Sequence, residues 1–281
     1  MKDSCDLCNY NCCYKSSVLK RGGRMVKYYF IHILNEISTK INSKKNRTLP
    51  KALIQECIKY YEEHDIFLKQ DEKYIEERAT LLSKNIITHT DFQRFITITR
   101  KSPTTYFTYY HSNIFDRIIN HLISKDSPKT QVQVPNNTIY IDLDLYQKNV
   151  VKRFKRKIAK NRTKSQIIID LRDKPGGYVQ ECVKICDMLL PKGSVFSQKY
   201  KEKVKTYFTN ADRLKFDKVT VLVSRNTASS SEILAQALEK KLPGCTVLGP
   251  NTIGKRVGQD HFVNKKYRFI FSVSSFVWKI S

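Results

Sequence analysis

A change in hydrophobic periodicity near residue 138 constrains the fold more than any other feature of this sequence. From about residue 51 to residue 123, apolar residues recur every three or four positions, which predicts helices. The stretch that begins at Thr138 instead alternates apolar and polar residues like a half-buried strand. Residues 165–171 form a near-continuous apolar run, typical of a strand covered on both faces of its sheet. The sequence therefore predicts a helical region followed by a core that contains strands.

Strand-length and helix-length segments alternate along the rest of the chain. We expect helices over 148–164, 179–189 and 230–241, and strands near 195 and over 219–223, 245–248 and 267–277. This alternation indicates the α/β class. The predicted organisation is an irregular, Cys-rich and basic segment with a linker over 1–50, a helical subdomain over 51–123 and an α/β core over 137–281 that is short at its C-terminal end. Within the subdomain, Thr90 precedes an apolar stripe and is expected to cap a helix.

The composition excludes a globally disordered chain and a transmembrane protein, and it makes a nucleic-acid binder worth considering. Of the 281 residues, 41% are hydrophobic, which suffices for a buried core, and no apolar run reaches the roughly 18 residues of a membrane-spanning helix. The formal net charge of +25 is typical of nucleic-acid binders. Its densest stretch, Lys148 to Lys164, also has apolar residues at helical spacing, so we interpret it as an amphipathic helix with a solvated basic face. We therefore expect no nucleic-acid partner, with a polyanion site on this helix as the alternative.

The eight cysteines fall into two groups. Four lie among apolar residues and are expected to be buried, reduced thiols: Cys57, Cys182, Cys186 and Cys245. The other four crowd the N-terminus: Cys5, Cys8, Cys12 and Cys13. The spacing of the first two suits half a zinc site, but the last two lack the usual gap, so we favour a loose thiol-bearing tail and predict no metal or other cofactor. Reduced thiols and the lack of a clear export signal predict a cytoplasmic location.

Three loops follow predicted strands, where ligands bind in open α/β sheets. The first, Asp170–Gly177, ends in two glycines that allow backbone N–H groups to face an anion. The second, Asn226–Glu232, has three consecutive serines before a helix, more than a helix cap requires. The third, Asn251–Gln259, has a lysine after a glycine but lacks the spacing of a nucleotide-binding phosphate loop. Each loop alone is compatible with a purely structural turn.

Taken in this order, the three loops resemble the catalytic core of the tail-specific, or carboxy-terminal processing, protease family of Ser–Lys peptidases. The Asp-Leu-Arg-x-Asn-Pro-Gly-Gly turn of the family is similar to Asp170–Gly177. Its Gly-Ser-Ala-Ser-Ala-Ser-Glu-Ile segment is similar to Asn226–Ile233, and its Thr-Phe-Gly-Lys-Gly-x-x-Gln segment to Thr252–Gln259. The resemblance implies a crotonase/Clp-protease-like ββα core with an N-terminal helical subdomain.

The resemblance also extends toward the N-terminus. The family's helical segment ends in a His-Ser pair, which is similar to His111–Ser112 here. Many members carry a PDZ module between that segment and the core, which captures substrate tails by strand addition. The stretch between Ser112 and Thr138 is too short for such a module, so we expect a PDZ-less member.

The resemblance implies roles for three side chains. The serine three residues before the glutamate, Ser229, is the implied nucleophile, and Lys255 is the implied general base. The implied partner that orients this lysine is Gln259, four residues further on. Lysine acts as a base only when neutral, so we expect burial to lower the pKa of Lys255. A neutral amide positions an amine without stabilising its charged form, which suits Gln259.

An oxyanion hole is implied at the same turn. It would combine the backbone N–H of Ser230 with that of Gly176 or Gly177. Several residues depart from the family pattern: Asn226 and Arg256 replace glycines, Ser230 replaces an alanine and Lys174 replaces an asparagine. A second cation next to Lys255 would lower the pKa of the lysine further or crowd the site.

The sequence thus predicts a serine endopeptidase that cleaves unfolded or tail-exposed polypeptides through a Ser–Lys dyad and an acyl-enzyme. The alternative is an inactive member that binds peptides or small hydrophobic ligands in the same cleft, because the interphotoreceptor retinoid-binding proteins share this core. The intact Ser229, Lys255 and Gln259 favour the enzyme, whereas Arg256 and the short C-terminal end favour the binding protein. Expected partners are polypeptide substrates, and the sequence carries no signal for an oligomeric state.

Overall fold

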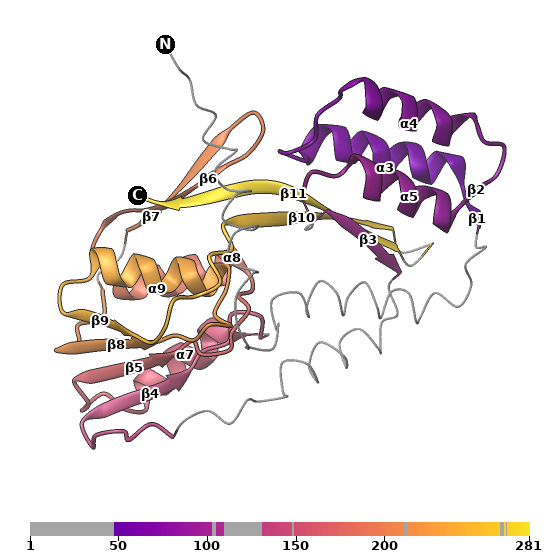
Figure 1. Cartoon of the computed structure of the whole chain (residues 1–281). Coiled ribbons are helices and arrows are strands. Elements are labelled where there is room, and N and C mark those ends of the chain that lie inside the picture. The colour runs from indigo at the N-terminus through magenta and orange to yellow at the C-terminus, as the bar shows by residue number, and fades with distance from the viewer. Residues whose placement is uncertain are drawn as a thin grey trace, which may run out of the picture. The chain divides into compact units, whose positions relative to one another are not determined.

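The computed structural model describes residues 48–102, 105–109, 131–147, 149–210, 213–264, 267 and 269–281. The cysteines at the N-terminus (Cys5, Cys8, Cys12 and Cys13) and the pair His111–Ser112 lie outside the described residues. The chain divides into two compact units (Figure 1). The first comprises Met1–His111 and Arg256–Phe276, and the second comprises Ser112–Lys255 and Val277–Ser281. The domain boundaries expected from the sequence remain predictions.

The first unit contains three helices where the sequence predicts helical structure: α3 (Lys51–His64), α4 (Glu72–Ser83) and α5 (His89–Thr99). The short strands β1 (Thr48–Leu49) and β2 (Ile87–Thr88) pair antiparallel beside them. Three longer strands complete the unit: β3 (Tyr106–Tyr109), β10 (Val257–Asn264) and the first part of β11 (Phe269–Ile280). Strand β11 pairs antiparallel with β3 and also lies next to β10.

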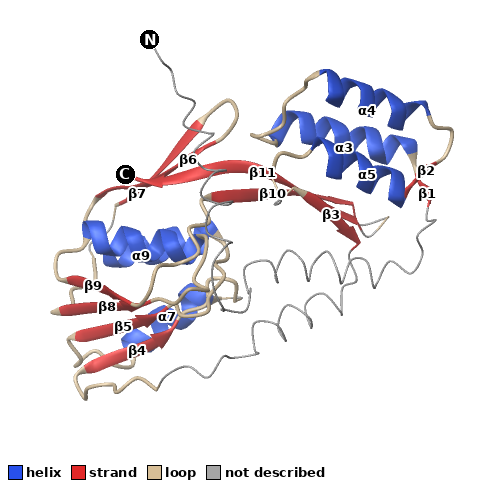
Figure 2. Ribbon diagram, viewed as in Figure 1, coloured by secondary structure: helices blue, strands red, loops and turns tan. Residues whose placement is uncertain are grey.

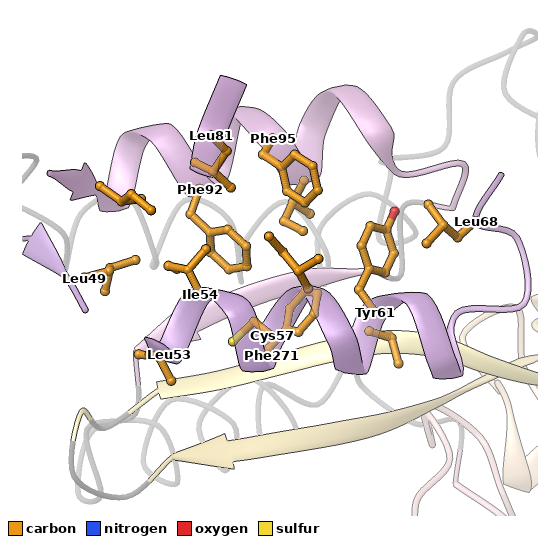
Figure 3. Close-up of a cluster of buried hydrophobic side chains, with 14 of the residues drawn as sticks. Leu49, Leu53, Ile54, Cys57, Tyr61, Leu68, Leu81, Phe92, Phe95 and Phe271 are labelled. Carbon is orange, nitrogen blue, oxygen red and sulfur yellow. The ribbon is translucent and has the colours of Figure 1, made fainter. Parts of the chain in front are cut away.

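The apolar stripes of the three helices and the inner face of β11 form the core of the first unit, hereafter the aromatic core (Figure 3). Its rings include Tyr61 from α3, Phe92 and Phe95 from α5 and Phe271 from β11. The ring centroid of Phe271 lies 5.8 Å from those of Tyr61 and Phe92, within the range of favourable aromatic contacts. Residues far apart in the sequence are therefore joined by ring packing.

The N-cap of α5 differs from the expected one. Thr88, not Thr90, caps the helix: its Oγ1 accepts a hydrogen bond from the N–H of Asp91 at 3.2 Å. The Asp91 carboxylate in turn accepts a hydrogen bond from the N–H of Thr88 at 2.8 Å. This reciprocal capping box satisfies two N–H groups at once, whereas the prediction considered the threonine alone. The expectation at Thr90 is therefore wrong by two residues.

The second unit is built on a parallel sheet with the strand order β4-β5-β8-β9 (Figure 2). Its strands are β4 (Thr138–Asp142), β5 (Gln166–Asp170), β8 (Lys218–Leu222) and β9 (Cys245–Leu248). All three strand pairs are parallel, and the connections contain α7 (Val150–Ala159), α8 (Val179–Leu189) and α9 (Ser230–Lys241). The α/β class is confirmed. The C-terminal ends of these strands point the three motif loops toward the same edge of the sheet.

A second layer of strands covers the helices of this unit. Strands β6 (Gly193–Lys199) and β7 (Val204–Thr209) pair antiparallel, and the last part of β11 pairs antiparallel with β6. Helix α9 contacts both β9 and β6 and therefore lies between the two layers (Figure 1). Helix α8 packs against α9 and β7. This arrangement buries both sides of α9, which explains why nearly all of its first eight residues are buried.

The basic stretch forms the amphipathic helix that its spacing predicts. In α7, Val150 and Phe154 are buried, while its lysines and arginines are exposed. Of the cysteines within the described ranges, Cys57, Cys182 and Cys186 are buried, Cys245 is half-buried, and all four are free thiols. Within the same ranges, the helices are too short or too polar to cross a bilayer.

Candidate active site

Ser229 lies at a sharp turn between a strand and a helix. Strand β8 ends at Leu222, and Ser229 occupies the N-cap position of α9. Its backbone has φ 55° and ψ −125°, a conformation that is rare and strained for a residue with a side chain. Such an elbow projects the serine hydroxyl away from the backbone. The side chain is half-buried, and its position agrees with the expected strand-to-helix turn.

The fully buried carboxylate of Glu232 joins two of the motif loops. Its Oε2 accepts hydrogen bonds from the N–H of Ser229 at 2.7 Å and from the N–H of Lys255 at 2.9 Å. Its Oε1 accepts from the N–H of Gly254 at 2.5 Å and from the hydroxyl of Thr252 at 2.6 Å. We call these five residues the Glu232 junction. Because one oxygen binds both backbones, the nitrogens of Ser229 and Lys255 are no further apart than the sum of those two distances.

Lys255 lies in the loop between β9 and β10. Burial lowers the pKa of its amine from the ordinary value of 10.5, while the charge of Glu232 acts in the opposite direction. The direction of the shift agrees with the expectation for a lysine that acts as a base. The carbonyl of Lys255 accepts a hydrogen bond from the indole N–H of Trp278 at 3.1 Å. The backbone of this lysine is thus fixed on both sides, by Trp278 and by Glu232.

The two glycines of the first loop pack closely against their neighbours. Gly176 has φ +104°, and a Cβ there would lie 2.8 Å from the Cβ of Ser229 and 3.0 Å from the nitrogen of Ser230. A Cβ on Gly177 would lie 2.4 Å from the carbonyl oxygen of Leu145. Only glycine fits at these positions, and its absence of a side chain brings the turn against the Ser229 backbone. Ser230 is the first residue of α9, so its N–H precedes the helical hydrogen bonds.

Side-chain hydrogen bonds hold the first loop and the serine loop together. The Asp173 carboxylate accepts from the amide of Asn226 at 2.8 Å and from the hydroxyl of Ser224 at 3.0 Å. The N–H of Ala228 donates to the carbonyl of Lys174 at 3.0 Å. Two positions that depart from the family pattern, Asn226 and Lys174, are therefore part of the contact between these loops.

Two ion pairs frame the edge of the sheet. Burial opposes the charge of Lys174, yet the hydrogen bond at 2.9 Å and the charge of Asp142 raise its pKa. Burial also opposes ionisation of Asp170, but hydrogen bonds from Arg172 and Tyr140 lower its pKa. The Arg172 guanidinium lies 2.7 Å from this carboxylate. Both pairs fix the backbone from which the glycine turn starts.

The remaining predicted site residue belongs to the first unit. Gln259 lies on β10 and is half-buried, and Arg256 directly precedes that strand. The expected interaction of Gln259 with the Lys255 amine remains a prediction.

Sequence reasoning missed the role of Glu232 and the contact made by Trp278. The spacing Ser229-x-x-Glu232 is that of a capping box, so its bond to the Ser229 N–H was open to prediction. Its bonds to Thr252, Gly254 and Lys255 were not, because they join segments that lie 20 or more residues away in the sequence. The contact of Trp278 with the Lys255 carbonyl has no sequence signal.

The groups gathered here are suited to acyl transfer. The site has a hydroxyl on an elbow, an amine whose pKa is lowered, and backbone N–H groups next to a glycine turn. Across the described ranges, there is no group of three His, Cys, Asp or Glu side chains arranged to hold a metal ion.

Comparisons with known proteins agree with this chemistry. Residues 137–276 match the family model described as peptidase family S41. A "Probable CtpA-like serine protease" of Staphylococcus epidermidis is 29% identical over 157 residues, 49% of this chain and 32% of that protein. A "Carboxyl-terminal-processing protease" of Synechocystis sp. is 35% identical over 96 residues, 34% of this chain and 22% of that protein. The matches thus span a third or less of the length of these two relatives.

A similarity to a solved structure extends over more of the chain. The structure of a lipoprotein from Streptococcus agalactiae matches with a TM-score of 0.61, covering 83% of this chain and 87% of that one. The sequence identity is 12%, so this similarity concerns the fold alone.

Proposed function

Because this chain belongs to peptidase family S41, which includes carboxy-terminal processing proteases, we propose that it is a serine endopeptidase acting through a Ser–Lys dyad. Its substrates are unfolded or tail-exposed polypeptides, and its intermediate is an acyl-enzyme. One observation carries the proposal: the Glu232 carboxylate binds the backbone N–H groups of both Ser229 and Lys255. The proposal includes a crotonase/Clp-protease-like ββα core, a helical N-terminal subdomain and no PDZ module.

In the acylation step, the neutral amine of Lys255 removes the proton from the Ser229 hydroxyl as its oxygen attacks the substrate carbonyl carbon. The carbonyl oxygen becomes an oxyanion, which accepts hydrogen bonds from the N–H of Ser230 and of Gly176 or Gly177. The Lys255 ammonium then protonates the departing amine nitrogen as the carbon–nitrogen bond breaks. The acyl group remains on Ser229 as an ester.

Deacylation repeats these steps with water. Lys255, neutral again, removes a proton from a water molecule that attacks the ester carbon. The second oxyanion collapses, the bond to Ser229 breaks, and the serine oxygen takes the proton back from the lysine. The product leaves with a new carboxylate.

The desolvation of the Lys255 amine, in a residue that is half-buried overall, gives this mechanism its base. A lysine of ordinary pKa is almost fully protonated near neutral pH, and burial increases the neutral fraction. The negative charge of Glu232 favours the protonated form of Lys255. However, the two oxygens of Glu232 accept four hydrogen bonds, which compensate this charge locally. In this proposal, Gln259 orients the amine without adding another negative charge.

Cleavage of reduced casein by purified full-length variants tests this function. The wild type and Ser231→Ala are expected to cleave, whereas Ser229→Ala and Lys255→Ala are expected to be inactive. Ser231 is a matched control because it is a buried serine on the same segment. Absence of cleavage by the wild type would favour a peptide-binding protein on a peptidase fold, and cleavage that persists in Ser229→Ala would exclude Ser229 as the nucleophile.

We also propose a cytoplasmic location. The free thiols of Cys57, Cys182, Cys186 and Cys245 are compatible with a reducing compartment. Localisation of the tagged full-length protein in its own cells, by fractionation, tests this point: recovery with secreted or membrane-enclosed markers would contradict it.

A further inference from the structure

Two exposed tyrosines stack beside the glycine turn of the candidate site. The rings of Tyr146 and Tyr178 have centroids 5.6 Å apart and planes inclined by 11°. They remain 42% and 54% exposed, so part of each ring is open to a ligand. Tyr178 directly follows Gly177, and its N–H donates to the carbonyl of Leu145 at 3.2 Å. Both rings are therefore anchored to the backbone of the turn and preorganised by stacking.

A cavity of about 700 Å³ opens beside this pair, in the second unit. Residues of α7 and α8 line it, and Tyr178 forms part of its wall. Its apolar wall includes Val151, and its polar wall includes Gln147 and Gln180. Known ligand pockets have volumes of about 300–1,000 Å³, so this one accommodates several side chains of a peptide.

The charges that line the cavity are mostly positive. Lys152 and Lys155 lie one helical turn apart on α7, are exposed, and form no ion pair with the described residues. A third lysine, Lys184 of α8, pairs with Glu181 at 2.7 Å. Since Glu181 is the acidic residue of the lining and is already paired, the cavity has an excess of positive charge. An acidic ligand complements it.

The cavity is close to the proposed nucleophile along the chain and in space. Gly176 packs against Ser229, and Tyr178 is only two residues further on. An extended peptide advances about 3.3 Å per residue. A substrate whose carbonyl lies over Ser229 therefore reaches the tyrosine within two or three residues.

We propose that this cavity is a substrate subsite that selects polypeptide segments with an acidic residue next to an apolar or aromatic one. The stacked tyrosines provide a flat surface for the apolar side chain, while Lys152 and Lys155 bind the carboxylate. Placing the subsite in a catalytic cycle rests on the proposed function, but binding at the subsite does not require catalysis.

Peptide binding to the full-length Ser229→Ala variant tests the subsite without turnover. The probes are three fluorescein-labelled, unstructured peptides of twelve residues that contain one central leucine flanked by two glutamates, two glutamines or two lysines. Fluorescence anisotropy gives their affinities at 50 mM and 300 mM NaCl. The glutamate peptide is expected to bind most tightly, and salt is expected to weaken it most, because exposed charges are screened.

Charge-matched variants separate the subsite from the general attraction of a basic protein. Lys152→Ala/Lys155→Ala is expected to weaken the glutamate peptide about fivefold, as for two exposed ion pairs. It is expected to leave the glutamine peptide unchanged, which also shows that the variant is folded. The control Arg156→Ala/Lys157→Ala removes the same charge from the same helix, outside the cavity, and is expected to leave both affinities unchanged.

The aromatic part of the subsite has its own control. Tyr178→Ala is expected to weaken the glutamate and glutamine peptides by a similar factor of about five, and Tyr178→Phe to preserve binding because the stacked ring remains. Phe208→Ala removes a ring of similar exposure from β7 and is expected to have no effect.

The outcomes distinguish the subsite from the proposed function. Equal affinity for the glutamate and glutamine peptides, or equal losses in the two charge-matched variants, overturns the subsite even if casein is cleaved. Selective binding that depends on Lys152 and Lys155 supports the subsite even if casein is not cleaved, and the peptidase proposal alone then fails.

Discussion

The aromatic core of the first unit consists of apolar side chains, whereas the Glu232 junction of the second unit is formed by a buried carboxylate and its hydrogen-bond donors. In the aromatic core, rings such as Phe92 and Phe95 contact other apolar groups and are at most 1% exposed. In the junction, an equally buried carboxylate is surrounded by backbone N–H groups and a hydroxyl. Burial alone therefore does not indicate what a region contributes.

The two regions make different contributions: the aromatic core stabilises the fold, whereas the junction determines where backbone groups lie. Removing apolar area from water stabilises the aromatic core and imposes little direction on any side chain. A buried carboxylate is costly unless it is hydrogen-bonded, so the junction exists only in the arrangement that gives Glu232 its four donors. That arrangement fixes the backbones of Ser229 and Lys255. We therefore expect substitutions in the aromatic core to alter stability alone, and those in the junction to alter activity whatever they do to stability.

Replacing Lys255, the proposed base, gives the largest expected effect. Lys255→Met keeps the length and apolar stem of the side chain but removes its amine, and kcat/KM on casein is expected to fall by about a thousandfold or more. The free energy of unfolding at pH 7 is expected to stay equal or rise, because the desolvated amine is gone. If chemical denaturation showed that Lys255→Met loses stability along with activity, the assignment of separate roles to the two regions would be contradicted.

A ring deletion in the aromatic core tests the opposite side of the comparison. Phe95→Ala is expected to lower the free energy of unfolding by about 3–5 kcal/mol, because it leaves a cavity among buried rings. Urea denaturation followed by fluorescence measures this loss. The kcat/KM per folded molecule is expected to stay within about twofold of the wild type, since transition-state interactions are unchanged.

The charge of the junction is tested by Glu232→Gln, which preserves shape. A glutamine presents N–H donors toward groups that are themselves donors, so at least one hydrogen bond is lost, and stability is expected to fall by about 1–3 kcal/mol. Activity is expected to fall about tenfold or more, because the two loops are no longer held in register. Thermal unfolding and casein cleavage measure the two effects, and Glu239→Gln, on the exposed end of α9, is the control.

The pH dependence of the second unit is expected to follow Lys255. The pKa of this lysine is lowered on folding, so the unfolded chain binds more protons between the folded pKa and 10.5. Stability is therefore expected to rise with pH through that window, and kcat/KM to rise with an inflection below 10.5. The rise of stability with pH in this window is expected to be absent from Lys255→Met, which lacks the amine. A wild-type kcat/KM that does not change from pH 6 to pH 10 would contradict a lysine base.

The smallest effect is expected at Ser231. Its buried hydroxyl has no hydrogen-bond partner among the described residues. Ser231→Ala is therefore expected to raise the free energy of unfolding by about 1 kcal/mol, with kcat/KM unchanged. Destabilisation in a urea titration would show that this hydroxyl has a partner, such as a bound water.

The sequence predicted segments whose local pattern is strong. The apolar run of β5 and the helical spacing of apolar residues in α8 were found because each pattern persists over an entire element. Strand β7 was missed because it is mostly exposed: Val204 and Phe208 are 63% and 55% exposed, and pairing with β6 defines the strand. Strand β10 was missed because its sequence lacks regular alternation.

The residues of the candidate site that lie in sequence motifs were predictable. The contacts that form only when distant segments fold together were not. Ser229 and Lys255 followed from local motifs and their resemblance to a family. The connection between them runs through Glu232, and only the folded chain brings Thr252 and Gly254 to that carboxylate. The stacking of Tyr146 on Tyr178 joins two loops and likewise has no local signal.

Trapping the acyl-enzyme would test the proposed Ser229–Lys255 dyad without relying on protein cleavage. The full-length protein would be mixed with the p-nitrophenyl ester of a short N-blocked peptide at pH 8, quenched in acid, digested and mapped by mass spectrometry. We expect an acyl group on Ser229 in the wild type and in Ser231→Ala, and none in Lys255→Met. An acyl group on another residue, or no acyl group while the ester is hydrolysed, would contradict a Ser229–Lys255 dyad.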